Sequence, residues 1–243
     1  MTVLQHCLEQ HQQVQVDARE IDLVQHIGEI IPLDAGQCVR DIGLMTHRRS
    51  LFALPLANRA SGTTDHPGIL DVTSFWREAG PRLWFAKDEA FDTRFRTRFL
   101  ALHEAATIGA LAAWAGTPEG SLALLVLLDQ FPRNAFRGTR RMYASDPFAR
   151  QIAAAAIAAG HDVALEPAMR LFVYLPFGHS EDLADQERSV AFAHGLGQPS
   201  LSHAERHRDI IRRFGRFPHR NPILGRTMTA EEQRYLDEGG YAG

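Results

Sequence analysis

The chain has 243 residues, of which 45% are hydrophobic and 23% are charged, and its formal net charge is −3. This composition is typical of a globular protein, and the near-neutral charge indicates neither a nucleic acid nor a membrane surface as a partner. The longest strictly apolar run, residues 122–128, is too short to cross a membrane. The two cysteines form no paired motif and the first residues lack a signal-peptide pattern, so a cytoplasmic location is expected.

Residues 1–68 are expected to form an N-terminal extension or linker, because they show no sustained hydrophobic periodicity. Within them, residues 15–31 fit either one amphipathic helix or a short pair of strands. Residues 59–68 read RASGTTDHPG and are rich in turn-forming residues, as is typical of a linker. Residues 69–243 are predicted to form a separate, all-helical domain.

The first long helix with clear signals is predicted to start at Asp88, whose side chain can accept a hydrogen bond from the first turn. It extends to about residue 115, with three phenylalanines at helical spacing, Phe91, Phe95 and Phe99. The sequence TPEGS interrupts it, and a helix over residues 119–130 follows. Residues 122–128 are apolar on every side of this second helix, which indicates a central position in the core.

Five further helices complete the predicted domain. Asp146 with Pro147 predicts a helix start, and Gly160 predicts its end. Three more helices are expected over residues 166–175, 180–196 and 200–214. A capping box of Thr229 and Glu232 begins a short last helix. Alternating β-branched residues are scarce after residue 69, so the predicted fold class is all-α, a stack of antiparallel helices joined by short loops.

Two polar residues directly follow the apolar run 122–128, in a region that should be buried. Asp129 and Gln130 end this helix, and a carboxylate at that depth needs a partner because an unpaired buried charge is costly. Arg133 and Arg137 are the nearest cations in the sequence. Two readings stay open: a structural ion pair that ties the helix end to its loop, or groups that orient the residues of a ligand site.

Histidines and a glutamine fall on helix faces that otherwise look buried. The predicted inward stripe of residues 180–196 consists of Leu183, Gln186, Val190 and Ala193, and His179 lies one turn before it. His207 lies on the inward face of the next helix. Such histidines are either hydrogen-bonded core residues or acid–base groups near neutral pH. His203 and His207 have metal-ligand spacing, but no third ligand motif follows, so no metal site is predicted.

Arginine is concentrated near the C-terminus, where residues 205–226 contain seven of the chain's 25 arginines. Residues 213–221 read RFGRFPHRN, so guanidinium groups alternate with aromatic rings in a segment bent by glycine and proline. A guanidinium stacked on an aromatic ring still presents a planar fork that suits carboxylate or phosphate. These arginines therefore indicate either a pocket for an anion or structural pairs with carboxylates such as Asp129, Glu181, Asp182 and Asp209.

Four segments carry the most distinctive motifs: FWREAGPRLWFAKDEAFD (75–92), LLDQFPRNAFRGTRRMYASD (127–146), YLPFGHSEDLADQ (174–186) and HRDIIRRFGRFPHRNPILGR (207–226). Together they resemble a bacterial family of proteins that share a domain of unknown function, number 924. The resemblance covers about residues 69–236 and implies an all-helical fold similar to tetratricopeptide repeat proteins, with no established activity. The chain departs from the family pattern at Gly178, where an acidic or large residue is usual.

Two functions of different classes follow from these features. The first is a His- and Arg-rich pocket for a small anionic ligand carrying phosphate or carboxylate, with possible hydrolase or transferase chemistry. Its predicted acid–base groups are His179, Glu181, His207 and His219. Its predicted ligand-binding residues are Arg133, Asn134, Arg213, Arg216, Arg220, Asn221 and Arg226. The predicted orienting residues are Asp129, Gln130 and Gln186. The alternative is a tetratricopeptide-like module that binds a peptide in a groove. No particular cofactor is indicated.

Overall fold

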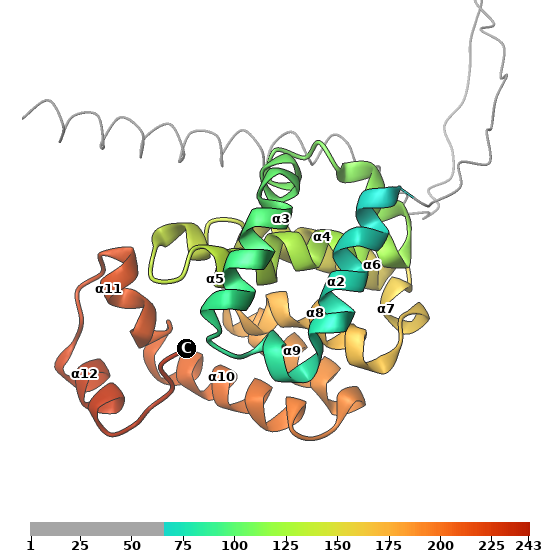
Figure 1. Ribbon diagram of the computed structural model, residues 1–243. Coiled ribbons are helices and arrows are strands. Elements are labelled where there is room, and N and C mark those ends of the chain that lie inside the picture. The colour runs from blue at the N-terminus through green and yellow to red at the C-terminus, as the bar shows by residue number, and fades with distance from the viewer. Residues whose placement is uncertain (1–65) are drawn as a thin grey trace, which may run out of the picture. The chain divides into compact units, whose positions relative to one another are not determined.

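This computed structural model describes residues 66–243, which form helices joined by short loops, with no strand among them (Figure 1). The predicted all-α fold class is therefore confirmed for this part of the chain. The predictions for residues 15–31 and for most of the linker lie outside the described residues. The first described helix, α2 (Pro67–Trp84), begins within the sequence expected to be linker, because the His66 side chain accepts a hydrogen bond from Gly68 N at 3.2 Å.

An aromatic cluster joins α2 to α3 (Glu89–Thr107). Asp88 caps α3 as expected, accepting a hydrogen bond from Phe91 N at 2.8 Å. The ring of Trp76 on α2 packs 5.5 Å from that of Phe95 on α3, and both side chains are fully buried. The helix ends at Thr107 rather than near residue 115, because Gly109 adopts a φ of 73° that a helix cannot continue through. A short 3-10 turn, Ala112–Gly116, follows.

The apolar segment lies at the centre of the described domain, as its composition predicts. Thr117 caps α4 (Pro118–Leu125), and residues 122–128 are all at most 1% exposed. The sequence predicts a single helix up to residue 130. In the structure α4 is instead followed by a π-helical turn, Val126–Gln130, and then by α5 (Phe131–Ala135). Pro132 has no N–H to donate back to Leu128, whose carbonyl accepts a hydrogen bond from Ser145 Oγ at 2.6 Å. This turn places Asp129 and Gln130 at the end of a buried helix.

The next helices form a packed series in which short loops join α8 to α9 and α9 to α10. They are α6 (Asp146–Ala158), α7 (His161–Ala164), α8 (Pro167–Gly178), α9 (Leu183–Leu196) and α10 (Ser200–Phe214). Helix α9 contacts both α8 and α10 extensively. It begins at Leu183 rather than residue 180, because Asp182 caps it by accepting from Asp185 N at 3.1 Å.

The predicted inward stripe of α9 is partly wrong. Leu183, in its first turn, is 43% exposed, whereas Gln186, Val190 and Ala193 are buried as expected.

The chain ends in two short helices, α11 (Asn221–Leu224) and α12 (Ala230–Asp237), the latter opened by the predicted capping box of Thr229 and Glu232. After α12 the chain turns back towards α10, where the Tyr241 ring lies 4.7 Å from that of His207 (Figure 1). No helix within residues 66–243 has the length and apolar character that crossing a bilayer requires.

Candidate functional site

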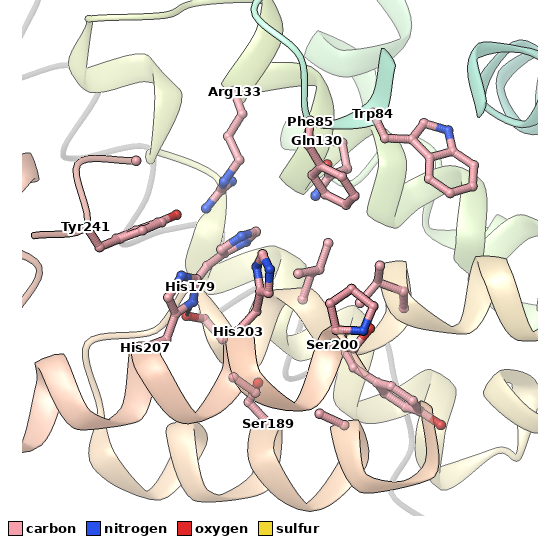
Figure 2. Close-up of a pocket in the computed structure, with 18 of the residues that line it drawn as sticks. Trp84, Phe85, Gln130, Arg133, His179, Ser189, Ser200, His203, His207 and Tyr241 are labelled. Carbon is pink, nitrogen blue, oxygen red and sulfur yellow. Dashed lines mark hydrogen bonds between the residues drawn. The ribbon is translucent and has the colours of Figure 1, made fainter. Parts of the chain in front are cut away.

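A cavity of about 470 Å³ lies where α8, α9 and α10 meet the end of α2, the π-helical turn and the C-terminal residues (Figure 2). This volume is in the range of pockets that bind small molecules. Three of the predicted acid–base groups line it, His179, His207 and His219. Four of the other predicted site residues do so as well, Gln130, Arg133, Asn134 and Arg220.

Asp129 lies behind the residues that line the cavity and holds several of them in place. The side chain is fully buried, and its Oδ1 lies 2.8 Å from His179 Nδ1 and 3.2 Å from Arg133 Nη1. Gln130 Nε2 donates to Asp129 Oδ2 at 2.6 Å. Burial opposes the ionisation of Asp129, but Arg133 and His179 outweigh it and lower its pKa to about 2. Arg133 is thus one of the two partners that the sequence suggested, while Arg137 pairs with Asp92.

His179 is held in one orientation by this carboxylate. Because ionised Asp129 only accepts hydrogen bonds, Nδ1 of His179 carries the proton and Nε2 is left as an unprotonated nitrogen. Burial and the nearby Arg133 lower the pKa of His179, although Asp129 acts in the opposite direction. The imidazole is therefore neutral at pH 7. A neutral histidine oriented by a carboxylate at a cavity wall can accept a proton from a bound molecule.

His207 and His219, the other two predicted acid–base histidines of the cavity, are also neutral at pH 7. Burial, reinforced by His179, lowers the pKa of His207 to about 3, and its Nδ1 lies 3.2 Å from the Gly178 carbonyl oxygen. Burial and the adjacent Arg220 lower the pKa of His219 to about 4. The Nδ1 atom of His219 is buried with no hydrogen-bond partner among residues 66–243. These two rings add polar atoms to the cavity without adding charge.

Arg220 is the most unusual group of the site. Its guanidinium lies between the rings of Tyr143 and Phe217, with its carbon 4.6 and 4.5 Å from their centroids, and the residue is 7% exposed. The nearest carboxylate oxygen, on Asp146, is 3.9 Å from Nη1, too far for a hydrogen bond. Its Nε is buried without a partner in the part of the chain that the structure describes. Burial lowers the pKa of Arg220, yet an arginine stays charged at pH 7.

The remaining predicted arginines do not line the cavity but pair with carboxylates. Arg213 Nε donates to Glu231 at 2.9 Å on the surface. Arg226 donates to Glu181 through two nitrogens, at 2.5 and 2.9 Å. Glu181, expected as an acid–base group, is therefore engaged, and it also accepts from Phe217 N at 2.8 Å. For these residues the structure favours the structural alternative that the sequence left open.

Three predicted amide residues also act within the fold. Gln186 Nε2 donates to the carbonyl oxygens of Gly178, at 2.9 Å, and Ser180, at 2.6 Å, and so closes the end of α8. Asn221 Oδ1 accepts from Arg226 Nε at 2.9 Å. Asn134 borders the cavity, but its Nδ2 donates to Asp92 at 2.7 Å. These contacts rigidify the wall of the site.

Arg216 provides a test of this structural role. Its guanidinium donates to the two carboxylate oxygens of Glu232, at 2.6 and 2.8 Å, and Glu232 is 2% exposed. We expect Arg216→Gln to lower the midpoint of thermal unfolding by a few degrees, because Glu232 loses its cationic partner.

The effect should depend on pH in a defined direction. Arg216 lowers the pKa of Glu232 from 4.5 to about 2, so this stabilisation is present above pH 4.5 and is lost as the pH falls towards 2. Thermal unfolding of both proteins from pH 7 to pH 2 measures it. Equal midpoints at pH 7 would contradict the assignment.

His203 and His207 both reach the cavity, as their spacing on one helix face predicts. From His66 to Gly243, no three histidine, cysteine, aspartate or glutamate side chains are grouped as a metal ion would require.

Sequence reasoning missed the aromatic and apolar residues of the cavity. Trp84, Phe85 and Leu171 line one end of it, and Tyr143 and Tyr241 line the other. Tyr143 has a buried hydroxyl with no hydrogen-bond partner among the described residues. Its position in the motif RRMYASD, beside charged residues, is a signal that could have marked it. Tyr241 carries no comparable signal, because only the returning C-terminal segment brings it to the site.

Comparison with known proteins gives a family. The model of a family of bacterial proteins of unknown function, DUF924, matches residues 72–240. The solved structure of ATU0120, a protein of unknown function from Agrobacterium tumefaciens, is 54% identical in sequence to this chain. That match has a TM-score of 0.70 and covers 70% of this chain and 97% of the other. No curated protein matches this chain. The family match spans most of the chain, and so this protein belongs to the DUF924 family.

Proposed function

We propose that the cavity binds a small anionic ligand and that the acidic group of this ligand pairs with Arg220. The observation that carries the proposal is a buried guanidinium with no hydrogen-bond acceptor within residues 66–243. Asp146, 3.9 Å from Arg220 Nη1, balances the charge of this guanidinium but accepts no hydrogen bond from it, and native proteins rarely leave buried polar groups without a hydrogen-bond partner. Tyr143 and His219 also line the cavity, and each has a buried polar atom without a hydrogen-bond partner among the described residues.

The pair of Asp129 and His179 supplies the chemistry of this proposal. A ligand held at Arg220 lies in the same cavity as His179, whose free nitrogen would accept a proton from the ligand or from a water molecule beside it. Asp129 would stabilise the imidazolium that forms. Hydrolysis of, or group transfer to, a small carboxylate or phosphate compound fits this arrangement.

A small ligand is better supported than a peptide in an open groove. Residues of α2, α5, α8, α9 and α10 and of the C-terminal segment all border the cavity, so it is surrounded by elements far apart in the sequence. An extended peptide needs a long open surface instead.

Acetate is the simplest probe of the proposal. Two-dimensional nitrogen–proton NMR spectra resolve the Nε–H groups of arginines. The signal that is missing from the spectrum of the Arg220→Gln variant is that of Arg220. We expect this signal to shift saturably as acetate is added at constant ionic strength, while that of Arg213, paired on the surface, stays in place. An Arg220 signal that does not respond to acetate would remove the proposed function.

A further inference from the structure

The geometry points to a ligand of defined class: a monocarboxylate with an apolar body about 10 Å long. This inference rests on the proposed function and adds what lies beyond the acidic group. Three features support it: the order of side chains along α8 and α9, an exposed aromatic residue at one end of the cavity, and a buried arginine with unused hydrogen-bond donors at the other.

The cavity is polar at one end and apolar at the other. Along α8 its lining runs from Leu171 through Leu175 to Gly178, next to His179. Leu171 and Gly178 are seven residue steps apart, which span about 10 Å at the rise of an α-helix. The cavity is therefore elongated along α8, with its polar end at the C-terminus of this helix.

Helix α9 repeats this order. On α9 the lining passes from Ser189 through Ala193 to Leu196, and Ser189 Oγ is 3.0 Å from where a Cβ on Gly178 would lie. Leu196 is therefore at the opposite end. Helix α10 is polar along its lining, which includes Ser200, His203 and His207. Helices α8 and α9 thus place polar groups at one end of the cavity and apolar groups at the other.

The apolar end includes two aromatic residues from the end of α2. Trp84 packs edge-to-face on Phe172 at 5.0 Å, whereas Phe85 is 63% exposed although it lines the cavity. In Figure 2, Trp84 and Phe85 lie on the opposite side of the cavity from His179, His207 and Tyr241. An apolar ligand body at this end would cover the Phe85 ring, which the rest of the described chain leaves in contact with water.

The polar end has one arginine with unused hydrogen-bond donors. Arg133 is already paired with Asp129 and with Asp146, whose oxygens accept from its two Nη atoms at 2.9 and 3.0 Å. Arg220 lies 3.9 Å from Asp146 and balances the second of these carboxylates, but it donates no hydrogen bond to a side chain among the described residues. A carboxylate adds a single negative charge and can accept two parallel hydrogen bonds from this guanidinium. A dianionic phosphate would add a second negative charge, which these two arginines compensate still less.

A series of acids tests the class of the ligand. The full chain is titrated calorimetrically with acetate, butyrate, hexanoate and octanoate, and with inorganic phosphate as the dianionic probe. We expect affinity to rise roughly fourfold for each added methylene, because each one is buried against apolar side chains. Phosphate is expected to bind no tighter than acetate. Equal affinities along the series, or phosphate as the tightest ligand, would overturn the inference.

A substitution at the apolar end of the cavity distinguishes binding of the carboxylate group from binding of the apolar body of the ligand. Leu171→Asn is expected to weaken octanoate binding by about tenfold and to leave acetate binding unchanged, since acetate does not reach this residue. Leu183→Asn, at an exposed leucine outside the cavity, is the matched control and should change neither. Equal losses for both acids in Leu171→Asn would contradict the assigned orientation.

The two proposals fail in different ways. If acetate shifts the Arg220 signal but affinity does not rise with chain length, only the inference of an apolar ligand body is wrong. If no acid shifts that signal, the proposed function falls as well.

Discussion

Arg220→Gln is expected to weaken carboxylate binding strongly while changing the stability of the protein little. Hydrogen bonds to charged groups contribute about 1.5–3 kcal/mol each, so the loss of a bidentate pair should weaken octanoate binding by about 100-fold or more. The free energy of unfolding should change by only about 1 kcal/mol, because Arg220 donates no hydrogen bond to a side chain in the described part of the chain and its ion pair with Asp146 is long, at 3.9 Å. Calorimetric titration and urea unfolding measure the two effects.

The combination of the two results is what distinguishes a binding residue from a structural one. Arg213→Gln is the matched control, since this arginine pairs with Glu231 on the surface and should change stability by only about 0.5 kcal/mol. If Arg220→Gln instead destabilised the protein by several kcal/mol and left octanoate binding intact, Arg220 would be a structural residue.

Asp129→Asn is expected to cause the largest loss of stability, about 3 kcal/mol. Asp129 is fully buried and joins Arg133, Gln130 and His179, and breaking a buried charge network leaves uncompensated groups behind. Arg133 keeps its pair with Asp146, which limits the loss. The same variant removes the group that orients His179, so any reaction that uses this histidine should also slow.

The pH dependence of this effect has a definite sign. The pKa of Asp129 is lowered from 3.8 to about 2 in the folded chain, so its stabilisation is present above about pH 4 and is lost as the pH falls towards 2. Urea unfolding of both proteins at pH 7 and at several acidic pH values measures this. Asp209→Asn, at an exposed aspartate on α10, is the control and should have little effect. Equal stability of Asp129→Asn and the unaltered protein at pH 7 would contradict the network.

Local signals predicted most of the helices correctly, because caps act over a few residues. Asp88, Thr229 and Glu232 form the hydrogen bonds expected of them, and the apolar run at residues 122–128 lies in the core. The π-helical turn at Asp129 was not predictable in this way. It depends on Ser145 and His103, distant in sequence, which satisfy the carbonyls of Leu128 and Leu127.

The candidate site was only partly predictable for a similar reason. Arginines at residues 213–226 look alike in the sequence, but their partners come from other elements. Three of them pair with glutamates on other elements: Arg213 with Glu231, Arg216 with Glu232 and Arg226 with Glu181. Arg220 alone of this group lines the cavity. The apolar half of the cavity gave no signal, since Leu171 and Leu196 read as ordinary core residues of amphipathic helices.

A crystal structure of the full chain with octanoate would show directly which residue binds the carboxylate. We expect the carboxylate within hydrogen-bonding distance of the Arg220 guanidinium, at about 2.7–3.2 Å, with the alkyl chain running along α8 towards Leu171 and Phe85. Arg220 bound to a carboxylate of the protein itself, with octanoate elsewhere or not bound, would contradict this expectation.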